Sequence, residues 1–200
     1  MNPPHYVYRV DHDLGFAPHI SNRVCTVCGC KKTTVERWAK KGSWVIGLGG
    51  VGTGRKDTLI YAMQIDDTPQ YKLFKKTYPK LAGYLNDKSI TPDAPVLVSR
   101  TFYYFGDRSP DIPCKLQHII HPTQGCKRLS DQDIAQLKKL VLSKYSIGRH
   151  GKPNNGASTK CKTCNLKCRK SEANPVAGDF SPPTPTHLAC GKRRRIFPVT

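Results

Sequence analysis

The chain has 200 residues, a length that favours one domain with its own hydrophobic core and a small appendage over two full domains. Its 33 Lys and Arg residues against 14 Asp and Glu give a net charge of +19, which suits a polyanion such as nucleic acid better than a small acidic substrate. Solubility alone is the other explanation of this charge. The sequence has no long apolar run, no signal peptide and no basic amphipathic helix, so we expect a soluble, cytoplasmic protein with no membrane partner.

The first forty residues predict a strand, a long loop and a short helix. Residues 6–10 alternate apolar and polar side chains as a short strand does. The Gly- and Pro-containing residues 11–30 indicate a loop, which is the first candidate location for a site. Thr33 and Glu36 have the spacing of a capping box and predict a helix that ends before Gly42.

Strand signals dominate the middle of the chain. Residues 43–48 and 58–65 are β-rich apolar runs separated by a glycine-rich loop, the pattern of a hairpin. A helix is predicted to begin at Thr68-Pro69. Residues 95–106 form the most strand-like segment of the chain.

The last predicted helix is capped by Ser130, with Ile134, Leu137, Leu140 and Val141 on the face that belongs to the core. After Ser146 the sequence changes to Gly, Pro, Asn, Lys and Cys with little apolar periodicity. We therefore place a domain at residues 1–146 and a basic, cysteine-containing tail at residues 147–200.

The hairpin loop contains the pattern G-x-G-x-x-G between Gly47 and Gly52, which in some folds binds a dinucleotide. That motif requires a helix directly after the glycines, whereas residues 53–57 lead into another strand. We reject the cofactor interpretation. The loop is better explained as a mobile hairpin whose tip residues, Arg55 and Lys56, approach a phosphate backbone.

The nine cysteines are odd in number and fall mainly into two clusters, which favours metal binding over disulfides. The three clustered thiols of the tail, with Cys190 and His187 downstream, can supply four ligands. Zinc is the favoured ion, with an iron–sulfur cluster or free thiols as alternatives. The first cluster is a weaker ligand set that lacks an obvious fourth member. The candidate ligands are Cys161, Cys164, Cys168 and Cys190 in the tail, and Cys25, Cys28 and Cys30 near the start of the chain.

Several short stretches between Asp11 and Pro153 share one order and spacing with a known family. They are Asp11-x-Asp13-x-Gly15-Phe16-Ala17-Pro18, Cys30, Gly42-Ser43-Trp44-Val45-Ile46-Gly47, Leu59-Ile60-Tyr61-Ala62-Met63, Tyr71, Val96-Leu97-Val98-Ser99, Phe102-Tyr103-Tyr104-Phe105-Gly106 and Ile112-Pro113. Over about three-quarters of its length the chain thus resembles the nucleotide modification associated domain 2 family of phages and bacteria, although Ser43 stands where we expect Asp. The resemblance implies a part in making, recognising or processing altered bases in DNA, beside other base-modification proteins. It transfers no catalytic role.

We predict an α+β fold with a curved, mainly antiparallel sheet, two or three helices and the cysteine-containing appendage. By analogy with readers of modified bases, the sheet could close into a small open barrel.

The candidate site residues are aromatic side chains that could stack on an unpaired base, cations that could contact phosphate, and polar groups that could contact a base edge. Alternation along a strand lets only half of the aromatic set face one way, and burial in the core is the alternative for each pair. The candidates are Trp44, Arg55, Lys56, Tyr61, Tyr71, Lys75, Ser99, Arg100, Tyr103, Tyr104 and Asp107.

We therefore expect a nucleic-acid-binding protein, with DNA as its ligand, that recognises or processes a modified base. The alternatives are an enzyme that acts on the base, as transferase or glycosidase, and a structural partner in a modification complex. A pocket that holds a buried carboxylate with a shifted pKa would favour the enzyme, whereas a pocket of aromatic and backbone groups would favour the reader.

Overall fold

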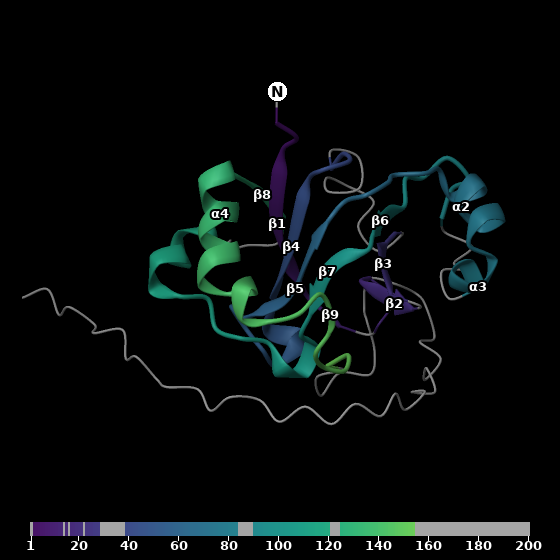
Figure 1. Cartoon of the computed structure of the whole chain (residues 1–200). Helices are drawn as coiled ribbons and strands as arrows, with labels where there is room; N and C mark the ends of the chain where they lie inside the picture. Colours follow the sequence, from purple (N-terminus) through teal and green to yellow (C-terminus); the bar gives the residue numbers. More distant parts are fainter. Residues whose placement is uncertain are drawn as a thin grey trace, which may run out of the picture. The chain divides into compact units, whose positions relative to one another are not determined.

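A computed structural model describes residues 2–13, 15, 17–21, 23–28, 39–83, 90–120 and 125–154 (Figure 1). These residues form one structural unit with two sheets and few helices, so the predicted α+β class is confirmed. No helix among them is long and apolar enough to cross a membrane.

The larger sheet has six strands in the order β8-β1-β4-β5-β7-β9. Its β1–β4 and β7–β9 pairs are parallel and the other three pairs are antiparallel, so the sheet is mixed but mainly antiparallel, as predicted. The strands are β1 (His5–Val10), β4 (Trp44–Gly49), β5 (Leu59–Gln64), β7 (Thr101–Tyr104), β8 (Cys126–Leu129) and β9 (Gly148–Arg149).

A smaller antiparallel sheet contains β2 (His19–Ser21), β3 (Val24–Val27) and β6 (Leu97–Ser99). Over the described residues the two sheets remain separate and form no barrel. The predicted strand over residues 95–106 is therefore wrong as a single element: it breaks at Arg100 into β6 and β7, which belong to different sheets. The carboxylate of Asp66 accepts the Arg100 backbone N–H at this break, which satisfies a donor that has left the ladder.

The α-helices are α2 (Tyr71–Thr77), α3 (Pro79–Ala82) and α4 (Asp131–Leu140). The predicted capping box at Ser130 is present, because its hydroxyl accepts the Asp133 N–H and the Asp133 carboxylate accepts the Ser130 N–H. Short 3-10 helices are η1 (Val51–Thr53), η3 (Gly106–Arg108), η4 (Cys114–Ile119) and η5 (Leu142–Lys144). The helix predicted near Thr33 falls almost wholly outside the described residues.

Three apolar clusters join these elements into layers. Ile134 and Leu137 of α4 pack on one face of the large sheet. Side chains from the large sheet meet those of β3 and β6 in a second cluster. Tyr71 and Phe74 of α2 pack against the small sheet in the third. Helix α4 therefore lies on one side of the large sheet, while the small sheet and α2–α3 lie on the other, as Figure 1 shows.

The glycines of the β4–β5 hairpin allow close packing of neighbouring chain segments. A Cβ at Gly47 would lie 2.2 Å from Cε1 of Tyr61, the residue opposite it in the ladder. Arg9 binds the hairpin from β1 by pairing with Asp57 at 2.7 Å and donating to the Gly49 carbonyl. The loop passes through η1 into β5 with no α-helix, which agrees with rejecting a dinucleotide-binding turn.

Replacing Gly47 should show how strongly the β4–β5 pair depends on this close approach. Because the added methyl must displace the buried Tyr61 ring, we expect Gly47→Ala to lower the free energy of unfolding by roughly 1–3 kcal/mol. Gly83→Ala is the control: no atom of the described residues lies within 4 Å of its added Cβ and its φ is −59°, so the change should be neutral or slightly stabilising. Denaturant titration of both variants tests this, and equal midpoints would contradict it.

Candidate functional site

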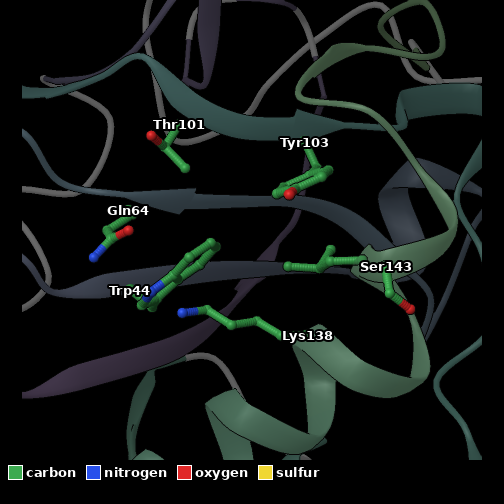
Figure 2. A pocket seen from close by; sticks show the side chains of 7 residues that line it. Trp44, Gln64, Thr101, Tyr103, Lys138 and Ser143 are labelled. Atoms are coloured by element: carbon green, nitrogen blue, oxygen red, sulfur yellow. The ribbon is translucent and has the colours of Figure 1, made fainter.

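A pocket lies on the α4 side of the large sheet, where three neighbouring strands present polar and aromatic side chains. Trp44 of β4 pairs with Gln64 of β5, which pairs with Thr101 of β7, so these three form one row across the sheet. Tyr103 stands two residues further along β7, opposite the small side chain of Ala62. Helix α4 adds Lys138, and η5 adds Leu142 and Ser143 (Figure 2). We call this the Trp44 pocket.

The Trp44 pocket has a volume of about 340 Å³, at the small end of ligand-binding pockets. The Lys138 ammonium lies 4.6 Å from the centroid of the Trp44 ring, a cation–π contact. Trp44 is only 3% exposed and belongs to the apolar cluster beneath α4. Tyr103 is partly exposed and offers its ring to the pocket. A planar ligand can therefore stack on Tyr103 directly, but must displace Lys138 to reach Trp44.

A second hollow shares Trp44, Gln64 and Lys138 with the pocket and continues toward the start of the chain. His5 lies in this extension, where its Nδ1 accepts the Trp44 backbone N–H at 3.0 Å and its Nε2 is 3.0 Å from Asp131. Burial lowers the pKa of His5, although Asp131 opposes that shift. Both ring nitrogens are engaged, so His5 fixes structure here and has no nitrogen left to act as a general base.

Of the predicted site residues, only Trp44 and Tyr103 are brought together in this pocket. Tyr61 and Tyr104 are buried in the cluster between the two sheets, which is the core alternative. Ser99 is buried and donates to the Thr101 carbonyl. Tyr71, the first residue of α2, is buried against the small sheet, while Lys75 and Arg100 are exposed in the layer across the large sheet from the pocket.

The two hairpin cations that the sequence predicts at a free tip differ in their surroundings. Arg55 donates through Nε and Nη2 to the hydroxyl and carbonyl of Ser109, so its guanidinium braces the hairpin against the segment after η3. Lys56 is exposed. Asp107, in η3, accepts the Lys152 N–H at 2.8 Å and so links η3 to the chain after β9.

The sequence did not single out Gln64, Thr101, Lys138 or Ser143, although they complete the pocket. Each is an ordinary polar residue at a strand or helix position, and only the pairing of β4, β5 and β7 beneath α4 gathers them. The available signal was the helical face itself: Lys138 follows directly after the buried Leu137 and so borders the apolar stripe of α4.

Two of the candidate metal ligands can be located. Cys25 packs in the cluster between the sheets, 3.8 Å from the Met63 sulfur, and burial raises the pKa of its thiol, which disfavours the thiolate. Cys28 is buried in a different cluster, beside α2. No group of three or more His, Cys, Asp or Glu among the described residues is arranged to hold a metal. Cys30 and the tail ligands Cys161, Cys164, Cys168 and Cys190 lie outside these residues, so zinc or iron–sulfur binding there stays a prediction.

One buried carboxylate, Asp13, lies away from the Trp44 pocket. It is 1% exposed, and its oxygens accept the Tyr104 hydroxyl at 2.8 Å and the Asn154 backbone N–H at 3.2 Å. Burial raises the pKa of Asp13 to about 6, although these hydrogen bonds lower it. The contact with Asn154, together with the β7–β9 pairing, holds the chain against the sheet beyond residue 146.

The raised pKa of Asp13 predicts a specific pH dependence of stability. The folded state keeps this proton up to about pH 6 and the unfolded state releases it near 3.8, so the wild-type protein should lose stability as pH rises through that window. Asp13→Asn lacks this titration. Its free energy of unfolding relative to wild type should therefore rise by about 3 kcal/mol between pH 3.5 and pH 7. Denaturant titrations at both pH values measure the difference, and a constant offset would refute the assignment.

The fold and the pocket define an α+β domain with a mixed sheet and an aromatic pocket on one face. Comparison of sequences then gives the family: the chain belongs to the nucleotide modification associated domain 2 family, whose model matches residues 2–90 and 83–160. The resemblance drawn from the sequence is thereby confirmed.

Three similar solved structures are of one protein, and their similarity to this chain is too low to indicate a function. The ASCH protein of Zymomonas mobilis is 10% identical, with 68% of this chain and 94% of that chain covered and a TM-score of 0.42. Two single-substitution mutants of that protein, one Tyr-to-Phe and one Ser-to-Ala, are 11% and 9% identical, both with TM-scores of 0.34. Their coverage is 68% and 70% of this chain, and 97% of each of those chains. No curated protein matches this chain significantly in sequence.

Proposed function

We propose that this chain is a nucleic-acid-binding domain of a DNA base-modification system and that it holds one unstacked base in the Trp44 pocket. The composition of the pocket carries the proposal: a partly exposed tyrosine ring, a tryptophan covered by a lysine ammonium, and the neutral polar groups of Gln64, Thr101 and Ser143. An aromatic face accepts any base, and an amide and hydroxyls can bond to its edge. Lys138 supplies a charge for the adjoining phosphate.

Reading a base fits the pocket better than reacting with it. Among the described residues no carboxylate lines the Trp44 pocket, and the carboxylate with a raised pKa, Asp13, is buried elsewhere with its oxygens bonded to Tyr104 and Asn154. His5, in the neighbouring hollow, has both nitrogens engaged. General acid–base catalysis requires a titrating group within hydrogen-bond reach of the ligand, and apart from the tyrosine hydroxyl the described lining residues offer only Lys138.

The direct test is a salt-titrated binding assay with single-stranded and duplex DNA and with matched RNA. Each oligonucleotide carries plain, hydroxymethylated or glycosylated bases and is recovered for mass analysis. We expect binding that weakens steeply with salt, a preference among the bases and an unchanged mass. A changed mass would establish an enzyme in place of a reader, and no binding even at low salt would overturn the proposal.

Substitution of Tyr103 tests whether the ring carries a base. Because stacking is worth roughly 1–3 kcal/mol per base, Tyr103→Leu should weaken binding of single-stranded DNA about 10- to 100-fold. Tyr103→Phe keeps the ring and should bind within about twofold of wild type. Unfolding curves for both variants check that the partly exposed position tolerates the change. Equal loss in the two variants would exclude stacking as the cause.

A further inference from the structure

Four exposed lysines stand together on α2–α3, in the layer on the other side of the sheets from the Trp44 pocket (Figure 1). They are Lys72, Lys75 and Lys76 of α2 and Lys80 of α3, and we call them the α2–α3 lysine face. Residues 71–82 contain no Asp or Glu. Among the described residues, none of these four lysines forms an ion pair.

Two of these lysines repel each other along α2. Lys72 and Lys76 are spaced i, i+4, where like charges destabilise a helix by about 0.2–0.5 kcal/mol. Helix α2 has seven residues, no side-chain cap at its N-terminus and no acidic residue in its first turn. Its stability comes from burying Tyr71 and Phe74 against the small sheet. Lys75 and Lys76 lie in the last turn of α2, where positive charge is favourable to the helix dipole, so the repulsion is that between Lys72 and Lys76. A ligand of opposite charge would remove this repulsion.

Aromatic side chains of the same segment position two cations. The Lys75 ammonium lies 5.1 Å from the centroid of the Tyr71 ring. Arg100, which follows β6, reaches the Tyr78 hydroxyl with Nη2 at 3.4 Å. Both rings belong to a packed cluster, because Tyr71 is buried and Tyr78 packs against Phe74 at a centroid distance of 5.1 Å. Lys75 and Arg100 are thus positioned by aromatic rings that are themselves packed in the cluster, and Arg100 extends the row of positive charge beyond the helices.

We propose that the α2–α3 lysine face, extended by Arg100, is a second nucleic-acid-binding surface that grips the phosphate backbone without reading sequence. The proposal rests on the function proposed for the Trp44 pocket in one respect, because the ligand is the same nucleic acid. Four lysines on two helices that carry no carboxylate complement a chain of phosphates. The α2–α3 lysine face and the Trp44 pocket lie in different layers of the domain. The domain therefore binds the phosphates of the strand at the lysine face and one base of the same nucleic acid in the pocket.

The salt dependence of binding distinguishes the two surfaces. The test variant is the full chain with Lys72→Gln, Lys76→Gln and Lys80→Gln, which keeps Lys75 over Tyr71 and retains good helix formers. The matched control carries Lys115→Gln, Lys139→Gln and Lys152→Gln. These substitutions replace three exposed lysines elsewhere on the fold and remove the same amount of positive charge. Binding of a duplex DNA is measured from low to moderate salt, and the slope of log affinity against log salt is compared.

We expect the α2–α3 variant to reduce the magnitude of that slope by about 2–3, near 0.9 for each lost phosphate contact, and to leave the preference among modified bases unchanged. The control should change the slope by less than about 1. Equal slopes in the two variants would overturn this inference while leaving the pocket function intact. A wild-type chain that binds no nucleic acid would overturn both. Loss of binding to vesicles of anionic lipid with an unchanged DNA slope would assign the face to membranes and likewise overturn the inference.

Discussion

The close pairing of β4 with β5 is the constraint on which the rest of the structure depends. Nearly every side chain on these two strands is buried, because α4 covers one face of the sheet and the small sheet covers the other. The register Gly47↔Tyr61 allows the Tyr61 ring to lie over a residue with no side chain. The same register sets Trp44 beside Gln64, so one backbone alignment determines both the packing of the central core and the floor of the Trp44 pocket.

The two faces of the large sheet consequently differ in chemistry. Toward the small sheet the side chains form a core with buried hydroxyls, in which Tyr8 and Tyr61 share a hydrogen bond and Tyr104 binds Asp13. Toward α4 a pocket remains at the end of the sheet, lined by residues of β4, β5, β7, α4 and η5. The polar network therefore lies on the face that packs on the small sheet, and the pocket lies on the other face.

Positive charge is likewise divided according to its surroundings. Arg9 forms an ion pair with Asp57, and Arg55 donates a hydrogen bond to the Ser109 carbonyl. Both contacts connect the glycine-rich hairpin to neighbouring segments of the fold. Lys138 covers an aromatic ring in the pocket. The lysines of α2–α3 have no ion-pair partners among the described residues. Among the described residues, the positive charges therefore include structural, pocket and surface contributions.

The sequence by itself determined what local physical signals can encode. The capping box at Ser130 and the apolar stripe after it are short-range patterns, and the helix they predict is present. The family, the α+β class and the mainly antiparallel sheet were also predicted correctly. Only the tertiary structure decided which way the aromatic side chains of β7 point. Both faces of this strand are apolar, so alternation does not show which face remains open. Tyr104 points into the core and Tyr103 into the pocket. The tertiary structure also decided the break at Arg100, the use of Arg55 as a brace and the arrival of Lys138 over Trp44, since each depends on a partner distant in sequence that no local pattern specifies.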